Sequence, residues 1–172
     1  MEPVAAYIKR ARETPLPAFQ RLHPHLFLFK HAKGAGGAPD TRAYIDHGVT
    51  RAYDLNFDPI PGECRIVVLE KKAGNPFPDR LSIGRSAECD VVIQLAFISK
   101  VHAHLFVQGD KLTLRDNNAS NSTFHNHKKL QPGAACSVKL GDILSFGGLD
   151  FELMDAARLH ELSRHSPLLT AR

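Results

Sequence analysis

Three short polar clusters hold the residues of this sequence that could do chemistry. They are Gly-Arg-Ser at residues 84–86, Ser-Lys-Val-His at 99–102 and a stretch rich in Asn and Ser at 116–123. Together they supply a guanidinium, an ammonium, hydroxyls and amides, but no carboxylate placed as a base and no nucleophile with an orienting partner. Because an arginine fork, a lysine charge and hydroxyl or backbone donors match the oxygens of a phosphate, this set predicts anion binding rather than catalysis.

The elements that must position these clusters are short strands. After Gly62 the sequence alternates between β-rich runs and turn residues, and in the run at 111–116 Leu112 and Leu114 alternate with Thr113 and Arg115. Such alternation indicates one buried and one wet face. The absence of long helices between the runs argues against a parallel α/β sheet. We therefore expect an all-β antiparallel sandwich whose loops gather at its ends. The expected strands are 65–70, 80–84, 91–93, 104–108, 111–116, 123–126, 136–140, 143–146 and 150–154.

The two ends of the chain have a different pattern. Residues 3–13 predict a short helix that stops at Pro15, residues 26–29 predict a buried strand, and the glycine-rich residues 33–39 predict a loop. Residues 40–58 give no firm indication. From Asp155 to His165 we expect a short helix with Asp155 as its N-cap, ended by Pro167.

These patterns predict three parts. Residues 1–61 form a partly ordered N-terminal extension that packs on the sandwich, residues 62–155 form the sandwich domain, and residues 156–172 form a C-terminal helix and tail. A hypothesis for the first part is that a kinase phosphorylates Thr14, Thr41 or Thr50 and that the domain then binds this segment. We favour packing, because the apolar run at 26–29 needs burial.

Composition indicates the class of protein and its cellular compartment. A hydrophobic fraction of 43% and a charged fraction of 23% are typical of a globular protein, and the net charge of +4 fits an anionic partner. Three cysteines without a CxxC pair indicate free thiols in a reducing compartment. The N-terminus lacks a secretory signal, and no apolar window is long enough to span a membrane. We expect a cytoplasmic protein.

The clusters resemble the motifs of the forkhead-associated (FHA) domain in order and spacing. Residues 99–102 resemble its Ser-Arg-x-His motif, residues 84–86 its Gly-Arg-Ser, residues 118–126 its Gly-Ser-Thr-Asn-Gly-Thr-x-Val-Asn stretch and residues 140–142 the end of its Leu-x-x-Gly-Asp. The resemblance covers roughly residues 63–154. It implies a sandwich of about 11 short strands that binds phosphothreonine peptides, without enzymatic activity, metal or cofactor.

The resemblance also implies a role for five contacting residues. Arg85 contacts the phosphate or the peptide backbone, and Ser99 donates its hydroxyl to the phosphate. Lys100 takes the place of the usual arginine and adds charge. Ser120 stands where the family has threonine and helps to hold the phosphate, whereas Asn121 hydrogen-bonds the peptide main chain.

Two further residues, Gly84 and His102, resemble those that hold the loops in place. Two departures stand beside them. Ala119 occupies a position where serine is common, and Ser122 one where glycine is usual. Because serine takes φ > 0 less easily than glycine, the loop around Asn121 is expected to sit differently and to bind peptide more weakly.

The function expected from this is a phosphothreonine-binding adaptor in Ser/Thr kinase signalling. Its expected partners are a phosphothreonine-containing protein or peptide and a Ser/Thr kinase or its substrate. Neither nucleic acid nor a membrane is expected as a partner. The alternative is a phosphate-independent interaction or scaffold module of the same fold. An enzyme is disfavoured, because the histidine pairs at 23/25, 102/104 and 125/127 lack a third ligand at a recognisable spacing.

Overall fold

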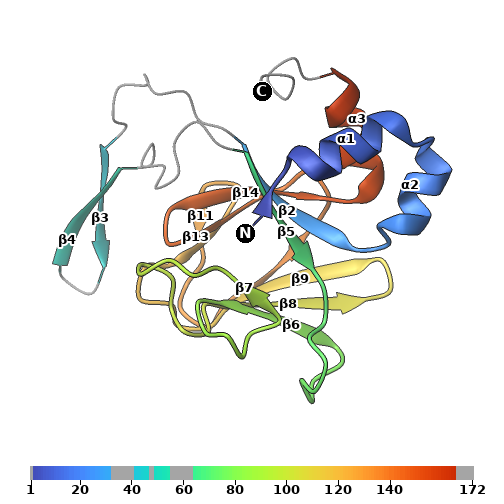
Figure 1. Ribbon diagram of the computed structural model, residues 1–172. Coiled ribbons are helices and arrows are strands. Elements are labelled where there is room, and N and C mark those ends of the chain that lie inside the picture. Colours follow the sequence, from blue (N-terminus) through green and yellow to red (C-terminus); the bar gives the residue numbers. More distant parts are fainter. Residues whose placement is uncertain (1, 32–40, 47–48, 55–63, 166–172) are drawn as a thin grey trace.

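The computed structural model describes residues 2–31, 41–46, 49–54 and 64–165. Two β-sheets lie face to face, and the helices gather at the upper right of Figure 1. Every strand pair is antiparallel except β6–β7. The predicted all-β sandwich is therefore confirmed, with 7 strands in one sheet and 5 in the other.

The order of the strands across each sheet differs from their order along the chain. The seven-stranded sheet runs β1 (Glu2–Pro3), β5 (Arg65–Leu69), β2 (Leu26–Lys30), β14 (Leu149–Met154), β13 (Ile143–Phe146), β10 (Thr123–His125) and β11 (Lys128–Lys129). The five-stranded sheet runs β12 (Ala135–Val138), β9 (Lys111–Asp116), β8 (Ala103–Gln108), β6 (Arg80–Gly84) and β7 (Val91–Val92). A separate ribbon pairs β3 (Thr41–Asp46) with β4 (Val49–Asp54).

The main core lies between the two sheets. Leu112 and Leu114 of β9 point into it, whereas Thr113 and Arg115 point out, as their alternation predicts. Phe146 and Phe151 enter from the seven-stranded sheet and are fully buried. Burial of such large apolar side chains supplies most of the driving force that closes a sandwich.

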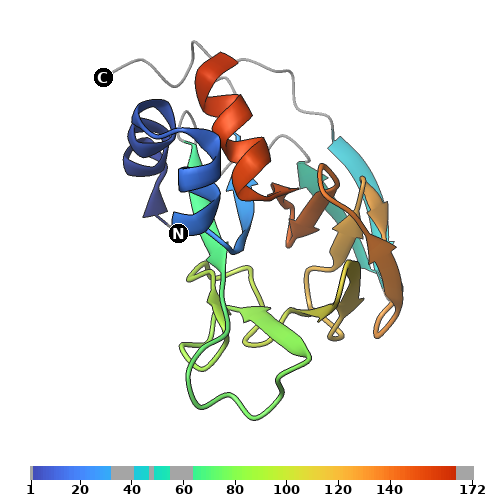
Figure 2. The same cartoon turned by 90° about the vertical axis from the view of Figure 1, so that its right-hand side faces the viewer.

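A second core explains why the run at 26–29 is apolar at every position. Leu28 faces the other sheet, whereas Phe27 and Phe29 face the helices α1 (Ala5–Glu13), α2 (Leu16–Leu22) and α3 (Ala156–His165). Both faces of β2 are thus covered, and a strand covered on both sides reads as a continuous apolar run. In Figure 2 the red helix α3 lies beside the blue N-terminal helices.

The helix predictions hold in part. The helix α1 ends at Glu13 as expected, and Asp155 caps α3 through a bond from the Arg158 N–H to its Oδ1 of 2.8 Å. The helix α2 was not predicted, because prolines at 15 and 17 read as a break. Proline is tolerated in a first helical turn, however, and here it begins the next helix.

Other differences concern short or separate strands. The strands β1 and β11 have 2 residues each, too few for a periodic pattern. No firm prediction covered the region of β3 and β4, and the loop expected at 33–39 lies outside the described residues, as does Pro167. The central strand β2 pairs with β5 and with β14, so the N-terminal segment supplies a strand to the sheet. The three domain boundaries stay a prediction. Within the described part of the chain, no helix is both long and apolar enough to cross a membrane.

Candidate functional site

The three polar clusters meet at one end of the sandwich. The backbone N–H of Arg85, just after β6, donates to the carbonyl of Ser99 at 3.0 Å. The next N–H, that of Ser86, donates to the carbonyl of Lys100 at 3.1 Å. From the third cluster, the N–H of Ser120 donates to the Ser99 hydroxyl at 3.1 Å. Loops that are distant in sequence are thus joined by direct hydrogen bonds around Ser99.

Close backbone approach at Gly84 makes this junction possible. A Cβ on Gly84 would lie 2.2 Å from the carbonyl oxygen of Lys100 and 2.9 Å from the Cα of Val101. Both contacts are with backbone, which cannot swing aside as a flexible side chain can. Only a residue without a side chain lets β6 and the 99–102 loop lie this close.

His102 joins the second cluster to the third from inside. Its ring is fully buried, its Nδ1 accepts from the Ser99 N–H at 3.2 Å, and its Nε2 lies 3.1 Å from the carbonyl of Ser122. Since Nδ1 accepts, the proton is on Nε2, which donates to Ser122. Burial lowers the pKa of His102, although the Ser122 carbonyl and the charge of Asp116 oppose the shift. The neutral ring is therefore the form that fits both bonds.

Ser122 adopts the backbone conformation that its glycine counterpart would favour. Its φ is 59°, in the left-handed region, and it is buried. Its carbonyl also accepts from the Gly147 N–H at 3.1 Å, and the preceding Asn121 donates its side-chain amide to the carbonyl of Phe97 at 2.8 Å. These bonds hold the loop in a conformation that costs a non-glycine residue energy.

A buried carboxylate supports the same loop from below. Asp116 accepts from the Thr123 hydroxyl at 2.6 Å, from the Ala119 N–H at 3.4 Å and from the Gly133 N–H at 3.3 Å. It is 2% exposed, so its charge depends on these donors rather than on water. Asp116 belongs to the third cluster, but its type and position gave no signal of this role.

The cations of the site stand at its surface. Arg85 and Lys100 are exposed, and among the described residues neither side chain has a hydrogen bond or an ion pair. The Ser99 hydroxyl accepts from Ser120, so its own O–H proton is still available to donate. The arrangement offers two positively charged residues and a hydroxyl donor on adjoining loops, which suits a small anion with several oxygens.

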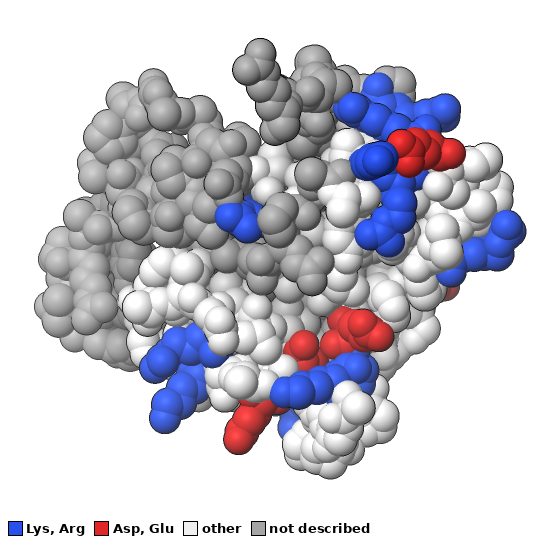
Figure 3. Space-filling view, in the orientation of Figure 1, with Lys and Arg blue, Asp and Glu red and all other residues white. Residues whose placement is uncertain are grey.

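On the described part of the face shown in Figure 3, positive charge does not form one broad basic surface. In Figure 3 the basic side chains on the described part of the face lie in separate groups, with acidic side chains among some of them. A candidate anion site on this part of the molecule therefore rests on the donors around Ser99.

Several histidines and cysteines of the described residues have contacts within the fold. No group of three or more His, Cys, Asp or Glu there could hold a metal ion. Of the histidine pairs, His102 supports the loops, and His125 contacts Asp142 at 2.8 Å. The three cysteines are free thiols, and the buried Cys89 donates its thiol to the carbonyl of Lys100 at 3.2 Å. No sequence signal points to this contact of Cys89.

Comparison with known proteins finds a matching family model for part of the chain. The family model of the FHA domain matches residues 81–147, which confirms the resemblance seen in the sequence motifs. This segment contains every residue expected to contact or support the ligand. No curated protein matches the chain.

Three solved structures are similar to parts of this chain. EmbR from Mycobacterium tuberculosis, in complex with a low-affinity phosphopeptide, is 24% identical with a TM-score of 0.41, over 44% of this chain and 20% of that one. The FHA-2 domain of an ABC transporter from Mycobacterium tuberculosis is 29% identical with a TM-score of 0.40, over 50% and 77%. The N-terminal FHA domain of Rad53p from S. cerevisiae, in complex with a phosphothreonine peptide, is 18% identical with a TM-score of 0.45, over 56% and 89%. The match to EmbR thus spans a fifth of that protein.

Proposed function

We propose, on the premise that residues 81–147 form an FHA domain, that this chain binds phosphothreonine peptides as an adaptor in Ser/Thr kinase signalling. Its partner is a protein that carries phosphothreonine, either a Ser/Thr kinase or a kinase substrate. The chain binds this partner and does not transform it, because the site supplies donors and cations without a poised base or nucleophile.

The observation that carries the proposal is the junction at Ser99. Its hydroxyl accepts the Ser120 N–H at 3.1 Å, its carbonyl accepts the Arg85 N–H at 3.0 Å, and its O–H proton is left to donate. A phosphate carries a charge of about −1.5 to −2 and three strong acceptor oxygens. The donors and cations of this junction suit a group with that charge and those acceptor oxygens.

Each contacting residue then has a distinct part. Arg85 offers its planar fork to two phosphate oxygens, and Lys100 adds a point charge beside it. Ser99 donates its hydroxyl to the phosphate, and Ser120 helps to hold the phosphate from the third cluster. Asn121 follows Ser120 and hydrogen-bonds the peptide main chain.

A peptide panel tests the proposal. The native chain is titrated with one peptide in three forms, carrying phosphothreonine, phosphoserine or unmodified threonine. We expect micromolar affinity for the phosphothreonine form, about −8 kcal/mol. The phosphoserine form is expected to bind more weakly, because the resemblance to FHA domains implies a pocket beneath the phosphate that accepts the threonine methyl group. The unmodified form is expected to lose at least about tenfold in affinity, because charge-assisted bonds to phosphate are absent. No binding of any phosphothreonine peptide from a degenerate library would contradict the proposal.

The alternative is a phosphate-independent module of the same fold, and the departures from the family motif at Ala119 and Ser122 are the features that favour it. Ser122 has φ 59° and bonds to His102 and Gly147, so the serine does not by itself require a displaced loop. Equal affinity for the phosphorylated and the unmodified peptide would favour this alternative.

A further inference from the structure

A groove of about 500 Å³ adjoins the candidate site on the outer face of the five-stranded sheet. Leu81 and Ile83 of β6 point into the core, so the side chains that alternate with them, Arg80 and Ser82, point to the outside. They form the floor together with His104 of β8, the cross-strand partner of Ser82. The segments at 72–77 and 86–89 line the sides.

The groove is continuous with the candidate site. Its lining includes Ser86 and Val101, the residues that directly follow Arg85 and Lys100. Its other end is lined by Phe77 and Arg80 at the start of β6. A peptide held by its phosphate at Arg85 can therefore continue into the groove along β6.

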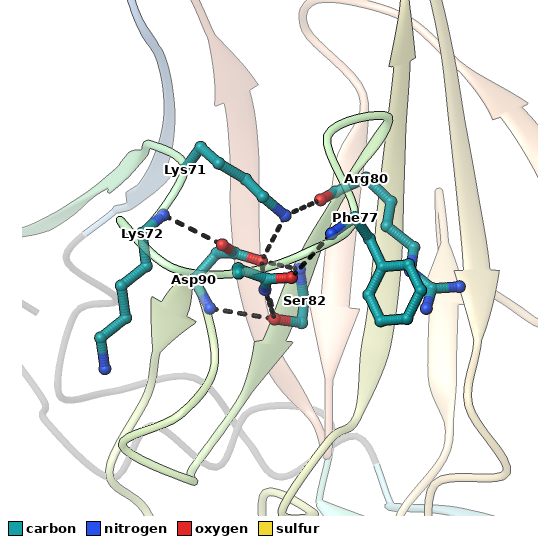
Figure 4. Close-up of polar contacts among 7 residues, drawn as sticks. Lys71, Lys72, Phe77, Arg80, Ser82 and Asp90 are labelled. Atoms are coloured by element: carbon teal, nitrogen blue, oxygen red, sulfur yellow. Dashed lines mark hydrogen bonds and ion pairs between the residues drawn. The ribbon is translucent and has the colours of Figure 1, made fainter.

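A buried carboxylate braces the segment at 72–77 against β6 (Figure 4). Asp90 accepts from the backbone and the hydroxyl of Ser82, both at 2.7 Å, from the Asn75 amide at 2.8 Å and from the Lys72 N–H at 3.0 Å. Lys71 completes the set at 3.3 Å. The negative charge of Asp90 is thus satisfied inside this network and offers little to the groove.

Arg80 is the residue of the groove whose side chain is a candidate ligand contact, because stacking orients its guanidinium. Its guanidinium carbon lies 3.9 Å from the ring centroid of Phe77, and Figure 4 shows the two side chains together. Phe77 is 49% exposed, one of few large apolar side chains on the described surface. Among the described residues, no hydrogen bond or ion pair reaches the Arg80 side chain. Stacking orients a planar fork whose donors are unpaired, and such a fork matches a carboxylate.

The other charged groups of the groove do not cancel the preference of Arg80 for a carboxylate. Lys72 adds a positive charge and Glu88 a negative one, and the Lys72 ammonium bonds the carbonyl of Ala87. Burial lowers the pKa of His104, and the charge of Arg80 lowers it further, which favours the neutral ring. Among the described lining residues, Arg80 and Lys72 carry positive charge and Glu88 carries negative charge, so the lining is positive on balance.

We propose that this groove binds the segment flanking the phosphothreonine and that Arg80, held by Phe77, binds an Asp or Glu side chain of the same peptide. This rests on the proposed function. A strand rises about 3.3 Å per residue, so Arg80 and Arg85 are about 16 Å apart along the chain. An extended peptide covers that distance in about five residues. The preferred acidic residue is therefore about four to six positions from the phosphothreonine.

A glutamate scan tests the subsite. Phosphothreonine peptides of one length carry a single Glu at each position within about six residues of the phosphothreonine, each with a matched Gln peptide. We expect Glu at one position, about four to six residues away, to bind about fivefold tighter than Gln, as a partly exposed ion pair allows. Arg80→Ala abolishes this preference, and Arg80→Glu transfers it to a Lys at the same position. Arg21→Ala, which removes an exposed arginine from α2, is the control and keeps it.

The outcomes separate the two proposals. Binding that requires phosphothreonine but ignores Glu at every position, or a preference that survives in Arg80→Ala, overturns the subsite and leaves the proposed function standing. Failure of every phosphothreonine peptide to bind overturns both. Equal unfolding midpoints of the native chain and Arg80→Ala show that a lost preference is not a folding defect.

Discussion

Arg85→Ala is expected to weaken binding of a phosphothreonine peptide about ten- to a hundredfold, because it removes charge-assisted hydrogen bonds worth about 1.5–3 kcal/mol. Arg85 is exposed, and its side chain has no hydrogen bond or ion pair within the described residues, so its removal costs the fold little. Only its backbone N–H is used, in the bond to Ser99, and alanine keeps that group. The expected loss is therefore one of ligand binding rather than of folding stability, and calorimetric titration measures it.

Two matched variants make this prediction specific. Arg85→Lys keeps the charge but loses the planar fork, so its affinity lies between those of the native chain and Arg85→Ala. Arg21→Ala lowers the net charge by the same amount at an exposed position on α2 and leaves the affinity unchanged. If Arg21→Ala weakened binding as much as Arg85→Ala does, the effect would be one of net charge, and a phosphate site at Arg85 would be wrong.

Gly84→Ala is expected to lower the free energy of unfolding by about 1–3 kcal/mol, as overpacking does, and to weaken phosphopeptide binding as well. The new Cβ would meet the Lys100 carbonyl oxygen at 2.2 Å, so the 99–102 loop must move away from β6. That movement breaks the bond from the Ser86 N–H to the Lys100 carbonyl and displaces Ser99. Urea unfolding gives the first effect, and peptide titration under native conditions gives the second.

Gly109→Ala separates loss of stability from damage to the site. Gly109 lies in the turn between β8 and β9, at the opposite end of β9 from the loop that holds Ser120. Its φ is 59° and an added Cβ there meets nothing within 4 Å, so alanine adds backbone strain without a clash. We expect this variant to be less stable yet to bind peptide normally. Native stability and affinity in Gly84→Ala would show that close approach at Gly84 is not required.

The strands of the sandwich could be predicted because their chemistry is local. Alternation in β9 and turn residues between the runs place nearly all of the longer strands of the two sheets close to their observed bounds. The helix α2 escaped prediction because proline can begin a helix as well as end one. The strands β1 and β11 are formed by their partners rather than by their own sequence, so two residues carried no pattern.

The site could be predicted only as far as side-chain types carry a signal. Motif order identified Arg85, Ser99 and Ser120, which the structure brings together, but it did not identify the groups that hold them there. The carbonyl of Phe97 accepts from Asn121, and that of Lys100 accepts from Cys89 and Ser86. Every residue has a carbonyl, so sequence does not show which one is used. The φ of 59° at Ser122 likewise depends on its tertiary bonds.

Amide chemical shifts during a titration with phosphothreonine peptide test most directly whether the three loops form one site, because they report all three loops at once. We predict that the N–H signals of Arg85, Ser99, Lys100, Ser120 and Asn121 shift together, along one binding curve, and that the unmodified threonine peptide leaves them in place. Shifts confined to one of these loops, or centred on the helices α1 to α3, would mean that the loops do not form a common phosphate site.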